Sequence, residues 1–197
     1  MKRTGIFSGS FNPVHVGHLA LANWICEYEN LDETWFLVTP HNPLKTQQHM
    51  LDFRTRYEMV QAATAGYPRF RASDFERSLP LPSYTLRTLR ALKHTFPGHL
   101  FHLIIGADNW QNMEQWKDAD ALLEEFPVLI YPRPGYDRPA PAPPTGVRRV
   151  DAPVMEISSS FIRDAIRQGR DIRFFLPEPV REKAVSFFAA PPADHTL

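Results

Sequence analysis

The stretch Gly9–His18, with the sequence GSFNPVHVGH, decides how the rest of the chain is interpreted. The apolar run 4–7 before it predicts a buried strand, and the apolar run 19–26 after it predicts a buried helix. The stretch is therefore expected to turn a strand into a helix near the N-terminus. Gly9 carries no side chain, so the backbone there can approach a ligand closely.

Two histidines in this turn are spaced to act together. A helix that begins near residues 14–17 directs free N–H groups and the positive end of its dipole into the turn, which favours a phosphate. His15 and His18 are three residues apart and share one face of that helix, so both can donate hydrogen bonds to the same anion. A metal site and two ordinary histidines are the alternatives. The chain has no HExxH motif, cysteine cluster, GxxxxGK[ST] loop or GxGxxG motif.

The composition is that of an ordinary globular domain. The 197 residues are 43% hydrophobic and 22% charged, and 22 basic residues balance 22 acidic ones, which argues against a general nucleic-acid binder. The single cysteine, Cys26, is expected to be a buried thiol in a reducing compartment. No apolar run approaches the ~18 residues of a membrane span, and the first run is too short for a signal peptide. We therefore expect a cytoplasmic protein.

Strand and helix patterns alternate along the chain. The run 35–38 predicts a second strand, which completes a strand–helix–strand unit and implies a parallel sheet. Asp52 is a candidate cap for a helix over 53–65, and Ser83 for a helix with Leu86, Leu89 and Leu92 on its buried face. Further strands are expected over 70–73, 100–105, 128–131 and 147–150.

Several polar groups follow the predicted strands, where parallel sheets bind ligands. Lys45, in a proline-rich loop, can reach a phosphate, and Asp108 can accept from ribose hydroxyls, hold a metal or simply cap a helix. Trp116 can stack on a flat ring or belong to the core. The serines 158–160 begin a helix that carries Arg163, which suits a triphosphate. An ordinary serine cap with a surface arginine is the alternative.

These segments resemble, in order, the motifs of the nucleotidylyltransferase superfamily. The stretch 9–18 resembles its (H/T)xGH motif, with Asn12 where the family usually has Asp, and ISSSFIR over 157–163 resembles its ISSTxIR motif. The segment SYT over 83–85, the segment IIGADNWQNMEQWKDADAL over 104–122 and the residues after the strand 128–131 resemble those of bacterial nicotinate mononucleotide adenylyltransferases. Arg87 stands where that family often has an acidic residue, and we expect it to face solvent.

The resemblance covers about residues 4–188 and implies both a fold and a reaction. The fold is an α/β, Rossmann-like, doubly wound and mostly parallel sheet with helices on both faces, in a single domain over 1–188, followed by a disordered tail over 189–197. In the implied reaction, the phosphate of nicotinate mononucleotide attacks the α-phosphorus of ATP. Pyrophosphate leaves and nicotinate adenine dinucleotide forms, a late step in making NAD. No covalent intermediate is needed, and Mg²⁺ accompanies ATP.

The resemblance also implies which residues act, with no metal held by side chains. The catalytic groups are His15, His18, Lys45 and Arg163. The ATP-binding groups are Gly9, Ser10, Phe11, His15, His18, Gly106, Asp108, Ser158, Ser159 and Arg163. The groups that bind nicotinate mononucleotide are Asn12, Lys45, Ser83, Tyr84, Thr85, Trp116 and Arg133.

Three alternatives remain open on the sequence. The same chemistry could act on nicotinamide mononucleotide or phosphopantetheine, although the SYT segment and Trp116 speak against phosphopantetheine. The chain could be a non-catalytic nucleotide sensor on the same fold, or His15 and His18 could belong to a metal-dependent hydrolase. No membrane or nucleic-acid partner is expected, and a homo-oligomer is left open.

Overall fold

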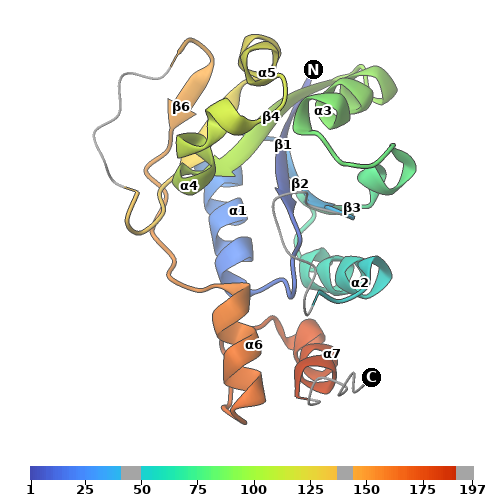
Figure 1. The fold of residues 1–197 in the computed structure, drawn as a ribbon, viewed down its shortest axis with the longest axis vertical. Coiled ribbons are helices and arrows are strands. Elements are labelled where there is room, and N and C mark those ends of the chain that lie inside the picture. Colours follow the sequence, from blue (N-terminus) through green and yellow to red (C-terminus); the bar gives the residue numbers. More distant parts are fainter. Residues whose placement is uncertain (41–49, 137–143, 190–197) are drawn as a thin grey trace.

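The computed structural model describes residues 1–40, 50–136 and 144–189. In this part of the chain, six parallel strands form one sheet in the order β3-β2-β1-β4-β5-β6 (Figure 1). The central strand β1 pairs with β2 on one side and β4 on the other, so the chain reverses its winding direction at β1. Ligands of such sheets bind where the winding direction reverses, at the carboxyl ends of the strands. The strands are β1 Lys2–Gly9, β2 Glu33–Val38, β3 Phe70–Ser73, β4 His99–Gly106, β5 Val128–Tyr131 and β6 Val147–Arg149.

Helices cover both faces of the sheet, because side chains alternate in direction along each strand. Phe7 of β1 packs in the apolar cluster under α1 and α2, whereas its neighbour Ile6 packs in the cluster under α3 and α5. The helices are α1 Val16–Tyr28, α2 Phe53–Thr64, α3 Thr85–Thr95, α4 Ala107–Gln111, α5 Ala119–Glu125, α6 Ser159–Arg167 and α7 Glu178–Phe188, with short 3₁₀ turns η1 Phe75–Ser78 and η2 Met113–Gln115.

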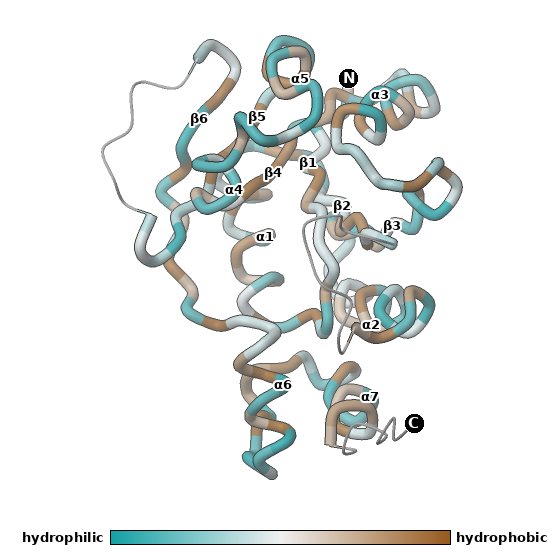
Figure 2. The backbone as a smooth tube through the Cα atoms, in the orientation of Figure 1, coloured by the Kyte–Doolittle hydropathy of each residue, from teal (hydrophilic) through white to brown (hydrophobic). Residues whose placement is uncertain are grey.

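The doubly wound sheet with helices on both faces is confirmed, and the sheet is parallel throughout. Figure 2 shows apolar colouring along β4 and on parts of α1 in the interior, and hydrophilic colouring on much of α5. The pair α6 and α7 lies together, at the end of the molecule away from the N-terminus (Figure 1). The interpretation of 1–188 as a single domain stays a prediction, and residues 190–197 of the expected tail lie outside the described residues.

The predicted helix caps have mixed outcomes. Asp52 caps α2 as expected, since its Oδ1 accepts from the Thr55 backbone N–H at 3.0 Å. The assignment of Ser83 as a cap is wrong, because α3 begins at Thr85, its cap position is Tyr84, and no side chain caps it in the described structure. Arg87 does not simply face solvent: it is half-buried, and its guanidinium lies 5.3 Å from the centroid of the Tyr84 ring.

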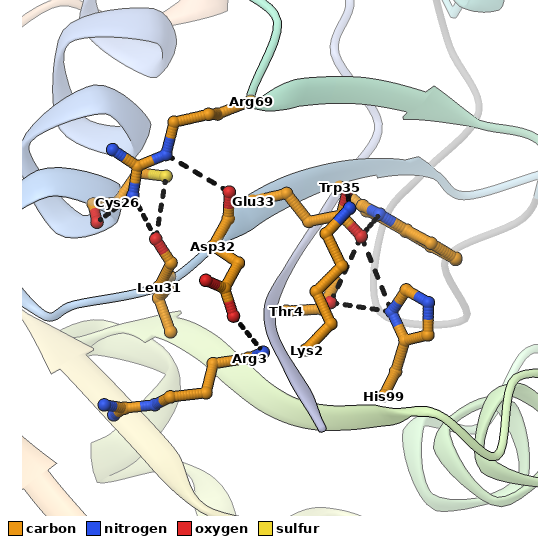
Figure 3. Close-up of polar contacts among 10 residues, drawn as sticks. All are labelled: Lys2, Arg3, Thr4, Cys26, Leu31, Asp32, Glu33, Trp35, Arg69 and His99. Atoms are coloured by element: carbon orange, nitrogen blue, oxygen red, sulfur yellow. Dashed lines mark hydrogen bonds and ion pairs between the residues drawn. The ribbon is translucent and has the colours of Figure 1, made fainter.

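The amino-terminal ends of the three central strands are joined by a polar network (Figure 3). The Glu33 carboxylate accepts from Lys2 Nζ at 2.7 Å, Trp35 Nε1 at 2.8 Å and Thr4 Oγ1 at 3.2 Å. His99 Nδ1 lies 2.8 Å from the same threonine hydroxyl. These bonds link β1, β2 and β4 at the end of the sheet opposite the ligand-binding end.

Candidate active site

Two cavities meet at the carboxyl end of β1. One has a volume of about 650 Å³ and the other of about 440 Å³. Gly9, at the last position of β1, lines both, as do Phe7 and Tyr131. The two cavities therefore adjoin at the point where the winding of the sheet reverses, and we call them the larger and the smaller cavity.

The larger cavity gathers most of the residues predicted to bind ATP. Two residues predicted to bind the mononucleotide, Asn12 and Arg133, also line it, whereas Gly106 lines the smaller one. Lys45 lies outside the described residues. The predicted residues in the larger cavity are Gly9, Ser10, Phe11, Asn12, His15, His18, Asp108, Arg133, Ser158, Ser159 and Arg163.

The histidine pair lies at the start of α1. The two rings are stacked with centroids 3.6 Å apart, and the His15 backbone N–H donates to His18 Nδ1 at 3.2 Å. Because that bond requires an unprotonated Nδ1, a neutral His18 carries its proton on Nε2. Phe11 packs edge-on against His18 at 5.1 Å between ring centroids. The His18 ring is thus fixed in place, and in its neutral form the other nitrogen, Nε2, is the donor.

His15 is the more deeply buried of the two histidines, with 3% of its surface exposed. Burial, aided by the positive charge of Arg133, lowers the pKa of His15 from 6.5 to about 4. At neutral pH His15 is therefore an uncharged hydrogen-bonding group. Positive charge in the larger cavity comes instead from Arg133 and Arg163.

The start of α6 is docked onto the loop after β1. Ser159 Oγ donates to the backbone oxygen of Pro13 at 2.9 Å, and Arg163 Nη1 donates to that of Asn12 at 2.8 Å. Ser158 caps the helix by accepting from the Phe161 N–H at 3.1 Å. These contacts bring the amino ends of α1 and α6 to one cavity, and each end favours an anion.

The Asn12 side chain makes a backbone contact that does not require the aspartate usual in the family. Its side-chain Oδ1 accepts from the Leu51 backbone N–H at 3.1 Å, just before α2 begins. This bond requires only an acceptor oxygen, which an amide supplies as well as a carboxylate.

The direct junction of β4 and α4 is shaped by Gly106, the last residue of β4. A β-carbon there would collide with the Asp108 carboxylate and lie 3.2 Å from the side chain of Arg133. Asp108 Oδ1 and Arg133 Nε are 3.6 Å apart, and within the described residues neither atom has a hydrogen-bond partner. Both groups therefore have hydrogen-bonding capacity available for a ligand.

The smaller cavity gathers the residues predicted to bind the pyridine ring: Ser83, Tyr84, Thr85 and Trp116. The uncapped start of α3 lies in its wall, and a helix start leaves backbone N–H groups without partners in the helix. Trp116 Nε1 has no hydrogen-bond partner among the described residues, and the Ser83 hydroxyl lies beside the buried Glu76 carboxyl. An aromatic face, free N–H groups and a hydroxyl suit a planar ring with a polar substituent.

The sequence gives no role to two buried side chains that lie beside the cavities, Arg56 and Glu76. The Arg56 guanidinium, 1% exposed, donates to the backbone oxygens of Ser10 at 2.7 Å, Thr39 at 3.0 Å and Leu51 at 3.0 Å. It therefore fixes the chain that follows both β1 and β2. The available indication was an arginine on the buried face of the predicted helix 53–65.

Glu76 is buried in the wall of the smaller cavity and accepts from Thr88 Oγ1 at 2.9 Å. Burial raises the pKa of this carboxyl, against the opposing effect of neighbouring hydroxyls. No motif or periodicity in the sequence indicates this position.

The fold and the site define the class: a nucleotide-binding α/β protein whose helix starts and basic side chains face a phosphate site. The model of the cytidylyltransferase-like family matches residues 6–165, so the chain belongs to that family. Within the described residues, every helix is too short or too polar to span a bilayer.

Curated relatives align with most of the chain. It is 51% identical over 183 residues to a protein of Bacteroides fragilis, covering 93% of this chain and 91% of the relative. It is 46% identical over 184 residues to a protein of Porphyromonas gingivalis, covering 93% of each. Both relatives are described as probable nicotinate-nucleotide adenylyltransferases.

Solved structures share the fold. A putative nicotinate-nucleotide adenylyltransferase of Vibrio parahaemolyticus aligns with a TM-score of 0.70 at 23% identity, over 94% of this chain and 99% of that one. The nicotinic acid mononucleotide adenylyltransferase of Plasmodium falciparum, solved with NaAD, aligns with a TM-score of 0.75 at 17% identity, over 96% and 95%.

We predict that Arg56→Met lowers the free energy of unfolding by about 3 kcal/mol, because three buried carbonyls lose a charged donor. Urea unfolding measures the change. Arg54→Met is the matched control: the Arg54 side chain is 84% exposed and pairs with Glu58 at the surface, so its loss should cost under about 0.5 kcal/mol. Equal effects of the two substitutions would contradict the role given to Arg56.

We predict that the lowered pKa of His15 makes the free energy of unfolding depend on pH. As the pH falls from 6.5 towards 4, the unfolded chain takes up a proton that folded His15 does not, so the folded state loses stability. This group alone contributes a slope of up to about 1.4 kcal/mol per pH unit, which levels off below the folded pKa. Urea unfolding of the wild type and His15→Asn across this range should give a shallower profile for the variant. Parallel profiles would show that His15 titrates normally.

Proposed function

We propose that the chain is a nicotinate-nucleotide adenylyltransferase, which joins the adenylyl group of ATP to nicotinate mononucleotide and releases pyrophosphate. The observation that carries this proposal is the pair of cavities that meet at Gly9. One is suited to a polyphosphate and the other to a planar ring. A transfer between two nucleotides needs two such sites whose phosphate ends meet. The proposal agrees with the descriptions of the chain's curated relatives.

In this proposal, ATP occupies the larger cavity. The amino ends of α1 and α6 and the Arg163 guanidinium bind the β- and γ-phosphates, with Ser158 and Ser159 at the second helix start. His18 donates from Nε2 to the phosphate under attack, where negative charge grows in the transition state. His15, uncharged, fixes the orientation of His18 by stacking on it and through its own backbone N–H.

Nicotinate mononucleotide occupies the smaller cavity, with its ring beside Trp116 and its carboxylate at the start of α3. Its phosphate then points towards Gly9, where no side chain blocks the approach to the α-phosphorus of ATP. The mononucleotide phosphate is itself the nucleophile, so the protein supplies position and charge and no covalent intermediate. Lys45 would neutralise charge between the two phosphates.

Mg²⁺ enters this account with ATP. Among the described residues, no group of three or more His, Cys, Asp or Glu side chains is arranged to hold a metal ion. The available ligands are therefore the phosphate oxygens, with Asp108 as the acidic side chain in the larger cavity. When bound, the ion would neutralise charge on the triphosphate. The buried free thiol of Cys26 fits a reducing compartment such as the cytoplasm, and a homo-oligomer stays a prediction.

Pyrophosphate release tests the reaction directly. ATP and Mg²⁺ would be supplied with nicotinate mononucleotide, nicotinamide mononucleotide or phosphopantetheine in parallel assays. We expect the highest kcat/KM with the nicotinate form and none with phosphopantetheine. Release with none of the three would reject the enzyme and favour a nucleotide sensor on the same fold.

We predict that His18→Ala lowers kcat on the order of 100-fold, the usual effect of removing one donor to a developing negative charge. His94→Ala, on the exposed surface of α3, is the matched histidine control and should leave kcat unchanged. Steady-state pyrophosphate release measures both. An unchanged kcat/KM in His18→Ala would remove this residue from the mechanism.

A further inference from the structure

Two cations lie over the same aromatic ring beside the smaller cavity. Lys117 Nζ is 4.7 Å from the centroid of the Tyr84 ring, and the Arg87 guanidinium carbon is 5.3 Å from it. Arg87 is also fixed by donating from Nη1 to the Pro80 backbone oxygen at 3.0 Å. Tyr84 occupies the cap position of α3, so both positive charges lie near the positive end of this helix.

The charge of the smaller cavity is set by few groups. Among the described residues that line it, Lys117 and Glu76 are the only basic and acidic side chains. Lys117 is exposed and forms no ion pair with a described carboxylate. Glu76 is 4% exposed, and burial raises the pKa of its carboxyl, which works against its negative charge. The lysine and the helix start therefore make the cavity favourable for an anion.

We propose that Lys117, assisted by Arg87, determines specificity by favouring pyridine nucleotides with a carboxylate on the ring over those with a carboxamide. This inference rests on the proposed function and adds the residues that set its selectivity. The two substrates carry the same ribose and phosphate and differ in the charge of the ring substituent. A cation near that substituent lowers the free energy of the charged ligand and has little effect on the neutral one.

The KM values distinguish a lysine that interacts with the ring substituent from one that binds the phosphate. A lysine that binds the phosphate would change the KM of both mononucleotides by the same factor. Loss of a lysine that interacts with the ring substituent would raise the KM for the nicotinate form alone. Because Lys117 is exposed, its effect should also weaken as salt is added.

The test compares kcat/KM for nicotinate and nicotinamide mononucleotides in four variants. We define the selectivity ratio as kcat/KM for nicotinate mononucleotide divided by kcat/KM for nicotinamide mononucleotide. Lys117→Met should lower this ratio roughly tenfold, by raising KM for the nicotinate form. Lys117→Arg should restore most of the ratio, and Arg87→Met should lower it about threefold because Arg87 does not line the cavity. Lys93→Met is the matched control, since Lys93 Nζ lies 5.7 Å from the Phe126 ring and away from both cavities.

Salt gives a second readout that a merely structural role would not produce. Raising the ionic strength should lower the ratio in the wild type and leave it nearly constant in Lys117→Met. An equal change in KM for both mononucleotides, or an unchanged ratio in Lys117→Met, would overturn the proposal while the enzyme still turned over. A wild-type protein that used neither mononucleotide would instead overturn the proposed function.

Discussion

The arrangement of the site depends on one buried guanidinium. Arg56 donates to backbone oxygens just after β1, just after β2 and just before α2, and so joins three segments through one side chain. The same segments also contact one another directly, through the Thr39 N–H bond to the Gly9 oxygen and the Leu51 N–H bond to Asn12 Oδ1. The loop after β1 then carries the start of α1, and α6 docks onto that loop through Ser159 and Arg163. Two helix starts are directed at one cavity because this loop has a fixed path.

The opposite end of the sheet complements this arrangement. There, Glu33 joins Lys2, Thr4 and Trp35, so the amino ends of the central strands are linked by side chains (Figure 3). At the carboxyl ends the strands open into cavities, and polar atoms of Asp108, Trp116 and other residues are left without partners within the described structure. The unsatisfied groups at the carboxyl end face the two cavities, where a ligand could bond to them.

The sequence predicts the six strands and the helices α1, α2, α3 and α6, because periodicity is a local signal, but it does not predict α4, α5 or α7. The predicted site residues within the described part of the chain all line one of the two cavities, although other residues of the cavity walls were not predicted. The sequence does not predict Arg56, whose partners are backbone carbonyls that leave no trace in residue identity. It also misplaces the start of α3 by assigning the cap to Ser83, since α3 has no side-chain cap and a serine before a helix normally indicates one. The half-buried position of Arg87 is not predicted either. Its partner is the Tyr84 ring at the start of the same helix, and no charge pattern in the sequence indicates that contact.

The central claim is that two nucleotides meet at Gly9, with the polyphosphate on the histidine side and the pyridine on the Tyr84 side. A crystal structure of the protein with nicotinate adenine dinucleotide tests this most directly. We predict that the adenylate half lies in the larger cavity with its phosphate beside His18, and that the pyridine lies against Trp116. A dinucleotide bound in the reverse direction, or confined to one cavity, would contradict the account.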